Sequence, residues 1–187
     1  MDTSTHRYFI ALLPPQDIQD SITAIKQYFA DTYDSRAALK SPPHITLQPP
    51  FVWEVKQIKL LNKYLQEFAQ QQESISITLS GFAAFVPRVI YVNVIKSPEL
   101  IKLHSDLIAY TETNLNIIDP SSKQRAYSPH VTVAFRDLTK QNFRTAWPDF
   151  QQRSIYFEFL VTHLTLLIHD GKKWHINAEF PFKVKID

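Results

Sequence analysis

The chain has 187 residues, of which 44% are hydrophobic and 13% aromatic, and this is enough apolar surface for the core of one domain. Its formal net charge of +2 is too small for a general nucleic-acid-coating surface. The chain has no cysteine and only two glycines, Gly81 and Gly171, which excludes disulfides, thiolate metal sites and the glycine-rich phosphate loops of Rossmann and P-loop proteins.

The sequence shows neither a membrane span nor an export signal. Its apolar runs fall short of the roughly 18 residues that a span requires. The N-terminal stretch MDTSTHRYF lacks the basic and apolar regions of a secretory signal. We therefore expect a cytoplasmic monomer with no membrane partner.

The first half of the chain predicts three strands and two helices. Ile18, Ile22, Ile25 and Phe29 recur at helical spacing, and two prolines at the end of a non-periodic loop force extended backbone just before His44. In chain order the elements are a strand over residues 6–14, a helix over 14–33, a loop over 32–43, a strand over 44–51, a helix over 54–72 and a strand over 75–86.

The second half repeats this order. Ser97 and Pro98 provide a helix N-cap and a proline at the first helical position, and Asp170-Gly171 suits a hairpin turn. The elements are a strand over residues 88–95, a helix over 98–110, a polar loop over 119–126, a strand from 130, a helix over 139–151, a strand over 154–169 and a strand over 172–180.

This repetition indicates an internal duplication with halves of roughly residues 1–87 and 88–187. Two lobes that face each other create one cleft, and no linker rich in Gly, Ser or Pro separates the halves. We therefore predict a single α+β domain over residues 1–187. Its two pseudo-symmetric lobes would each be a mainly antiparallel sheet with helices on the outer face, and they would enclose a central cleft.

Two similar motifs occupy the same place in each half, SPPHITLQPPF from Ser41 and YSPHVTVAF from Tyr127. In a strand, residues two apart point to the same face, so each motif presents an imidazole beside a hydroxyl. The pairs are His44 with Thr46 and His130 with Thr132. A proline and a loop precede each histidine, which favours a functional interpretation over a chance match.

A third triplet of the same kind, His163 to Thr165, provides a comparison. It lies inside the apolar run over residues 159–168, no proline precedes it, and the other half has no counterpart. A packed or surface histidine of a sheet explains it better than a catalytic role.

Metal binding is the competing chemistry, since His163, His169 and His175 surround the hairpin turn and sheet histidines can bind zinc. Their six-residue spacings match no structural zinc pattern, the chain has no HExxH motif, and Lys172 would lie across the turn from His169. We therefore expect neither a metal nor a cofactor.

Four stretches resemble the two-histidine (2H) phosphoesterase superfamily, which includes bacterial RNA 2′,3′-cyclic phosphodiesterases known as 2′-5′ RNA ligases. They are RYFIALLP, PHITLQPPF, RVIYVNV and SPHVTVAF, and the similarity covers nearly the whole chain. The resemblance implies that His44, Thr46, His130 and Thr132 form the active site. It also implies a role in RNA processing and the possibility of reversible 2′-5′ ligation.

The chain departs from this family after each motif. Many bacterial members have an arginine where this chain has Phe135, and a Phe-Leu-Gly-like run where it has Pro49-Pro50-Phe51.

Hydrolysis of a cyclic phosphodiester needs a base for the attacking water, an acid for the departing ribose oxygen and donors for the charged oxygens. Two histidines and two threonines match this requirement, because the histidine pKa of about 6.5 allows one neutral and one protonated ring near neutral pH. By resemblance, an RNA end or cyclic nucleotide would yield a 2′-phosphate. We assign His130 as base and His44 as acid.

Further polar or strand residues are candidates for holding the substrate, since arginine pairs with phosphate and tyrosine stacks on bases. They are Arg125, Tyr127, Tyr8, Ile10, Arg88 and Tyr91, of which Arg125 and Tyr127 rank first because they are near His130.

Two alternatives remain open. The chain could be a non-catalytic module that binds nucleotides or RNA ends, or an enzyme for 2′,5′-linked oligonucleotides or ADP-ribose 1″,2″-cyclic phosphate. Complete His and Thr pairs favour an enzyme, and the loops over residues 32–43 and 117–126 would determine the pocket shape.

Overall fold

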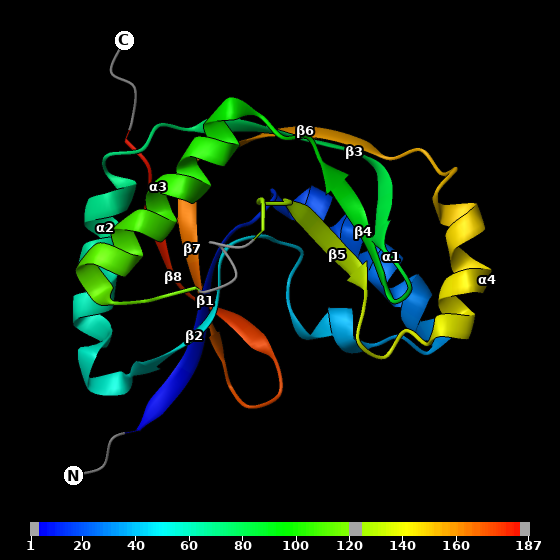
Figure 1. Ribbon diagram of the computed structural model, residues 1–187, viewed down its shortest axis with the longest axis horizontal. Helices are drawn as coiled ribbons and strands as arrows, with labels where there is room; N and C mark the ends of the chain where they lie inside the picture. The colour runs from blue at the N-terminus through cyan, green and yellow to red at the C-terminus, as the bar shows by residue number, and fades with distance from the viewer. Residues whose placement is uncertain (1–3, 120–124, 184–187) are drawn as a thin grey trace.

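The computed structural model describes residues 4–119 and 125–183, and within these ranges the chain forms two four-stranded antiparallel sheets (Figure 1). The first sheet has the strand order β2-β1-β7-β8 and the second the order β5-β4-β3-β6. The first consists of Thr5–Leu12 (β1), Ile45–Glu54 (β2), His163–His169 (β7) and Trp174–Pro181 (β8). The second consists of Ile75–Phe85 (β3), Val89–Val94 (β4), His130–Ala134 (β5) and Tyr156–Val161 (β6).

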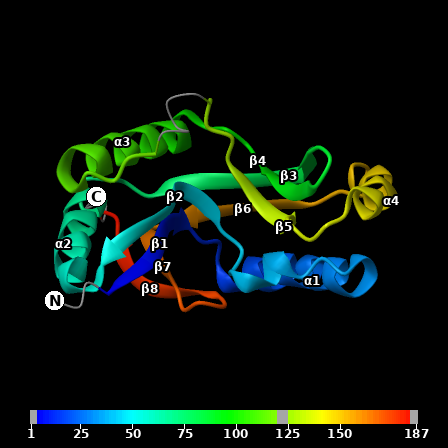
Figure 2. The same ribbon diagram turned by 60° about the horizontal axis from the view of Figure 1, so that its bottom comes forward.

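Helices cover the outer side of each sheet (Figure 2). The four α-helices of the described ranges are Gln16–Tyr33 (α1), Ile58–Ala69 (α2), Pro98–Leu115 (α3) and Lys140–Phe150 (α4), and the two 3₁₀ turns are Ala37–Lys40 (η1) and Val55–Gln57 (η2). None of these helices is long and apolar enough to cross a membrane. The expected N-cap of α3 is confirmed, since the Ser97 hydroxyl accepts from the Leu100 amide at 3.1 Å.

The two lobes exchange helices. α1 follows β1 of the first sheet but packs against β5 of the second, whereas α3 follows β4 of the second sheet but packs against β2 of the first. β3 also pairs with β4 and β6, so each sheet takes strands from both halves of the sequence. The predicted fold class is confirmed, and this interleaving is a feature that element order alone did not predict.

The predicted strand over residues 154–169 is in fact two strands, β6 and β7, which belong to different sheets and meet at Thr162. β6 alternates exposed and more buried side chains, as a strand with one solvated face does, whereas residues 164–167 of the central strand β7 are all fully buried. One continuous apolar run therefore concealed the crossing from one sheet to the other.

The predicted helix over residues 54–72 begins only at Ile58, because β2 continues to Glu54. β2 is an edge strand of its sheet. Since an edge strand has unpaired backbone positions, it accommodates Pro49 and Pro50, which a central strand would not.

Candidate active site

The first histidine motif lies at the start of β2. His44 immediately precedes the strand, and Thr46 shares its side, because residues two apart in extended backbone point the same way. Ile45 and Leu47 point to the other side and are 0% and 1% exposed. The buried aliphatic side chains therefore fix the direction of the imidazole and the hydroxyl.

The second motif repeats this arrangement in β5. His130 begins the strand opposite Asn93 of β4, and Val131 and Val133 are both fully buried while Thr132 lies on the His130 side. β5 is an edge strand like β2, and the two edges approach each other between the sheets.

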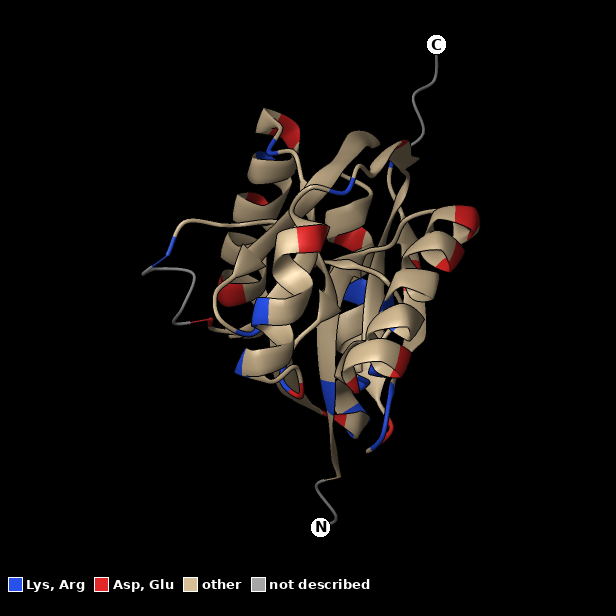
Figure 3. Ribbon diagram, turned by 90° about the vertical axis from the view of Figure 1, so that its right-hand side faces the viewer, with Lys and Arg blue, Asp and Glu red and all other residues tan. Residues whose placement is uncertain are grey.

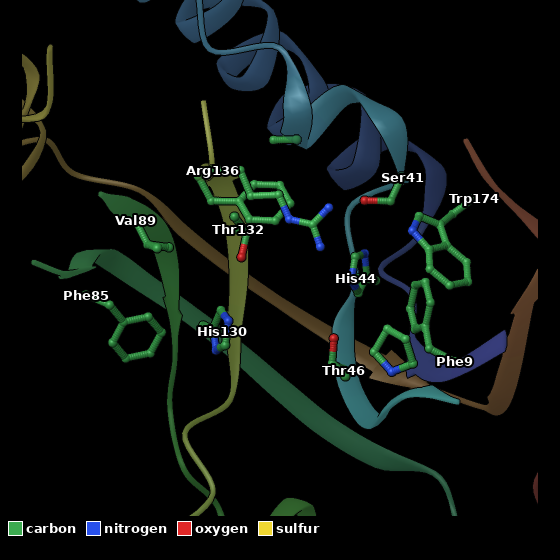
Figure 4. A pocket seen from close by; sticks show the side chains of 13 residues that line it. Phe9, Ser41, His44, Thr46, Phe85, Val89, His130, Thr132, Arg136 and Trp174 are labelled. Carbon is green, nitrogen blue, oxygen red and sulfur yellow. The ribbon is translucent and has the colours of Figure 1, made fainter. Parts of the chain in front are cut away.

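The two motifs meet across one cavity of about 290 Å³ (Figure 4). His44 and Thr46 lie on one wall, and His130 and Thr132 lie on the opposite wall. The fold thus brings together the four residues that the sequence singled out.

Each imidazole is oriented by the backbone carbonyl two residues before it. Nδ1 of His44 lies 2.7 Å from the Pro42 oxygen, and Nδ1 of His130 lies 2.7 Å from the Ser128 oxygen. Because a carbonyl oxygen only accepts, each Nδ1 carries the proton and donates it. In the neutral ring Nε2 then has a free lone pair with which to accept a proton.

Aromatic rings surround both histidines. The Phe9 ring centroid is 4.7 Å from that of His44 and 4.6 Å from that of Trp174, while Phe85 and Tyr91 each lie 5.1 Å from His130. These apolar walls remove water from the imidazoles, which disfavours their charged forms.

The histidine pKa values follow from this burial. Burial is the main cause that lowers the pKa of His44 to about 4, the charges of Lys26 and His130 lower it further, and the Pro42 carbonyl opposes the shift. Burial also lowers the pKa of His130, against the Ser128 carbonyl. Both rings are therefore neutral at pH 7 in the unliganded site.

Arg136 is the charged residue of this cavity that the sequence interpretation missed. It follows β5 with a left-handed backbone (φ 58°), and its guanidinium carbon lies 5.0 Å from the centroid of the Phe135 ring. Figure 4 shows the guanidinium extending into the cavity between the two histidine walls. The sequence did contain a signal for this residue. Many bacterial family members have an arginine at the position of Phe135, and this chain has its arginine one residue later.

Asp137 fixes the turn that carries Arg136. Its carboxylate accepts from the Ser35 hydroxyl at 2.9 Å and from the Arg36 and Ala37 amides at 2.8 Å each. The turn after the second motif is thereby attached to the loop that leads to the first motif.

Charge on the wider surface is mixed. On the face in Figure 3, Lys and Arg are interspersed with Asp and Glu. Among the described residues that line the cavity, Arg136 is the only lysine or arginine. Attraction of a phosphate would therefore be a local property of the cavity.

Arg125 and Tyr127, the first-ranked substrate candidates, line a second cavity of about 260 Å³ that shares Thr46 and His130 with the first. The Tyr127 hydroxyl donates to the Thr46 carbonyl at 2.9 Å, and its ring stacks on His104 with centroids 3.6 Å apart. Tyr127 thus connects the two halves at the site. The loop expected over residues 117–126 lies partly outside the described residues.

The remaining candidates are placed differently. Tyr91 lies beside His130, but Tyr8 and Ile10 point into the core on the opposite face of β1 and are at most 2% exposed. Phe9, between them, occupies the cavity side, so the expectation for Tyr8 was displaced by one residue. Arg88 is exposed in the turn between β3 and β4 and does not line the cavity.

The three histidines of the metal alternative have separate partners. His163 Nε2 lies 3.1 Å from Glu179, His175 Nε2 lies 2.7 Å from Asp170, and His169 accepts from the Gly171 amide. In the described part of the chain, no group of three or more His, Asp or Glu side chains could hold a metal ion. His163 also lies outside the cavity of the two motifs.

Sequence comparisons identify a family and several relatives of this chain. The model of the 2′-5′ RNA ligase superfamily matches residues 14–173. A protein of Geobacillus kaustophilus named "Putative phosphoesterase" is 30% identical over 177 residues, covering 93% of this chain and 95% of the relative. A protein of the same name from Bacillus pumilus is 31% identical over 179 residues, covering 93% and 96%.

Solved structures share the fold. Escherichia coli LigT in complex with 3′-AMP superposes with a TM-score of 0.72 at 18% identity, covering 97% of this chain and all of LigT. The protein TT0787 of Thermus thermophilus gives 0.63 at 16% identity, covering 96% and 100%.

Proposed function

Because the chain belongs to the 2′-5′ RNA ligase superfamily of two-histidine phosphoesterases, we propose that it hydrolyses the 2′,3′-cyclic phosphate of RNA ends or nucleotides to a 2′-phosphate without a metal. The observation that carries the proposal is the pair of imidazoles on opposite walls of one cavity, each with Nδ1 bonded to a carbonyl and Nε2 free. Such a pair provides one proton acceptor and, once protonated, one proton donor.

Binding of the anionic substrate allows one of the two neutral imidazoles to take up a proton from solvent. A cyclic phosphate between the walls raises the pKa of both rings, because a nearby negative charge favours the imidazolium form. One ring can then hold a proton while the other stays neutral. The starting state for acid–base catalysis thus forms only when the substrate is bound.

The reaction balances with these groups. The neutral histidine takes a proton from water as the water oxygen bonds to phosphorus, and the bond between phosphorus and the ribose O3′ breaks. The protonated histidine gives its proton to O3′. One water is consumed, a 2′-phosphate and a 3′-hydroxyl form, and proton exchange with solvent restores the rings. The Thr46 and Thr132 hydroxyls and the Arg136 guanidinium would donate to the non-bridging oxygens.

The aromatic wall suits the nucleoside. Phe9 and Trp174 beside His44, and Phe85 beside His130, offer apolar surface on which a base can stack. LigT of E. coli, which shares the fold, has been solved with two nucleotides, 3′-AMP and ATP, and with phosphate.

A direct assay tests the proposal. The protein is incubated with each 2′,3′-cyclic nucleotide in excess chelator, and ³¹P NMR distinguishes a 2′-phosphate product from a 3′-phosphate. We expect turnover in chelator and a 2′-phosphate. Loss of turnover in chelator with recovery on adding zinc or manganese would instead make the two histidines metal ligands, and binding without turnover would support the non-catalytic module.

A second substrate class has its own supporting observation. The cavity that contains Arg125 and Tyr127 shares Thr46 and His130 with the first, so a phosphodiester at the histidines has space for a group on both sides. This favours 2′,5′-linked oligonucleotides as alternative substrates. Assaying a 2′,5′-linked dinucleotide beside the cyclic nucleotides under identical conditions would separate the two, since a higher kcat/KM identifies the better substrate.

A further inference from the structure

The aromatic wall beside His44 continues outward to a tryptophan. Trp174 begins β8 and lines the cavity, and its ring centroid lies 4.6 Å from that of Phe9. Figure 4 shows both rings on the side of His44 that is turned away from His130. The Phe9 ring contacts His44 directly, so it suits the base of the nucleotide that bears the cyclic phosphate. Trp174 lies one ring further from the phosphate.

An arginine lies over the Trp174 ring. Arg7 is two residues before Phe9 on β1 and points to the same face of the sheet. Its guanidinium carbon is 5.6 Å from the centroid of the Trp174 ring. Arg7 is exposed, and none of the ion pairs among residues 4–119 and 125–183 includes it. Its N–H donors are therefore available for a phosphate.

The turn between β7 and β8 adds two further cations beside Trp174. Lys172 and Lys173 immediately precede it, and both are exposed. Asp170 is the acid of this turn. Its carboxylate accepts from the amides of the two lysines at 2.7 Å each and lies 2.7 Å from the Nε2 atom of His175. Asp170 thus holds the backbone of the turn, and the two ammonium groups project into solvent without an acidic partner in the turn.

We propose that Trp174, Arg7 and the two lysines of the β7–β8 turn form a subsite for the nucleotide that precedes the cyclic phosphate in single-stranded RNA. The base of this nucleotide stacks on Trp174, and Arg7 binds the phosphate that joins it to the terminal nucleotide. The inference rests on the proposed function and narrows its substrate class, because an RNA end fills this subsite and a free cyclic nucleotide does not.

Single-stranded nucleic acid is the occupant that this surface favours. Proteins that bind it combine a positively charged path along the backbone with aromatic rings on which successive bases stack. The planes of the Phe9 and Trp174 rings meet at 79°, so bases stacked on them are turned away from each other. A single strand allows this and a duplex does not. α2 and α3 pack on the opposite face of the sheet, the face of Tyr8 and Ile10, and leave this one accessible.

The first test measures binding and needs no turnover. Calorimetry compares an RNA dinucleotide that ends in a 3′-phosphate with the matching mononucleotide 3′-phosphate. The wild type should bind the dinucleotide more tightly. Trp174→Leu, which keeps an apolar side chain against Phe9, should reduce that preference by about 5- to 150-fold, the value of one stacked base. Equal affinity of the wild type for the two ligands, or an unchanged preference in folded Trp174→Leu, would overturn the proposal.

Arg7→Gln tests the phosphate contact at an exposed position, so its result does not depend on whether Trp174→Leu folds. Titrations of the dinucleotide at several salt concentrations should give a slope of log Kd against log salt that is smaller by about 0.7 than in the wild type, as for one phosphate contact of a single strand. Arg144→Gln is the control and should keep the wild-type slope, because this exposed arginine lies on α4, far from the first sheet (Figures 1 and 2). A wild-type slope in Arg7→Gln would also overturn the proposal.

Kinetics separate this proposal from the proposed function. A dinucleotide with a 2′,3′-cyclic phosphate end should have a higher kcat/KM than the cyclic mononucleotide, and Trp174→Leu should lower the first value more than the second. If the wild type prefers the dinucleotide in binding but hydrolyses neither ligand, the proposed function fails and the subsite stands. If it hydrolyses and binds both equally well, the proposed function stands and the subsite is refuted.

Discussion

The two histidine motifs have the same geometry but different electrostatics. In each half a helix residue contacts the position three residues before the histidine. Lys26 of α1 donates to Ser41, and His104 of α3 stacks on Tyr127. Each histidine in turn donates from Nδ1 to the carbonyl of the residue after that position, at 2.7 Å.

The two halves differ in the contact that a helix makes with the residue three positions before each histidine. In the first half it is a buried cation, which helps to lower the pKa of His44 to about 4. In the second half it is a stack of two rings, and burial lowers the pKa of His104 as it does that of His130. The two motifs thus hold their imidazoles in the same way, while the residues that contact them from the covering helices differ in charge and in the kind of contact.

The largest effect should come from removing either imidazole. His44→Ala and His130→Ala should each reduce kcat/KM on a 2′,3′-cyclic nucleotide by about 100- to 10,000-fold, the usual loss of a well-placed acid or base. His163→Ala is the matched control, because this third HxT histidine lies outside the cavity. If His163→Ala lost as much activity in a folded protein, the chosen pair would be wrong.

Loss of the Arg136 guanidinium should rank next and has no counterpart in the first half. Arg136→Gln removes the cation that extends between the walls, and kcat should fall by about 100- to 1,000-fold, as for one donor of an oxyanion hole. Arg125→Gln, in the second cavity, is the control and should mainly raise KM. An equal loss of kcat in both variants would argue against a special role for Arg136.

What the sequence could predict depended on local periodicity. The alternation of side chains in a strand placed His44 with Thr46 and His130 with Thr132 on shared faces, and the buried Ile45 and Val131 agree with this placement. The exchange of α1 and α3 between lobes was not predictable, because the length and pattern of a helix do not specify which sheet it covers.

The two charged residues near the histidines were missed for different reasons. Arg136 reaches the cavity through a left-handed backbone at φ 58°, which no strand pattern predicts. Lys26 lies at the i+4 position after Ile22 on the buried stripe of α1, so a charged residue on an apolar stripe was the available signal. The assignment of Ile25 to that stripe concealed it, since Ile25 is only partly buried.

The two threonines should show whether both walls contact the phosphate. Thr46→Val and Thr132→Val each remove one donor to a charged oxygen, worth about 1.5–3 kcal/mol or roughly 10- to 150-fold in kcat/KM. Comparable losses would show that the site is symmetric at the phosphate. A loss confined to one variant would show that the phosphate lies against a single wall. Wild-type values in both variants would exclude these hydroxyls from catalysis.

Burial of Lys26 should also change how the free energy of unfolding depends on pH. The pKa of Lys26 is about 7 in the folded protein and about 10.4 in an unfolded chain, so the unfolded state binds more protons between these values. Stability must then rise with pH across this window, by at most about 1.4 kcal/mol per pH unit. Chemical denaturation at about pH 7, 8 and 9 should show a steeper rise in the wild type than in Lys26→Met. Parallel curves would mean that Lys26 keeps an ordinary pKa when buried.

The smallest effect should come from removing the hydrogen bond between Tyr127 and Thr46, which joins the two halves of the chain at the site. Tyr127→Phe removes the donor to the Thr46 carbonyl, a loss of about 0.5–1.5 kcal/mol in the free energy of unfolding and roughly 2–4 °C in Tm per kcal/mol for a chain of this size. Because the phenol supports the backbone of Thr46 from outside the first cavity, kcat/KM should fall less than in Thr46→Val.

The exposed Tyr156 provides the control, since Tyr156→Phe also removes one hydroxyl, at 3.3 Å from Glu158, and should leave Tm unchanged. The alternative is the role expected from the sequence, in which Tyr127 contacts substrate. In that case Tyr127→Phe would keep the wild-type Tm and lose as much kcat/KM as Thr46→Val. A fall in Tm with nearly unchanged kinetics would instead show that Tyr127 joins the two halves of the chain at Thr46 without contacting substrate.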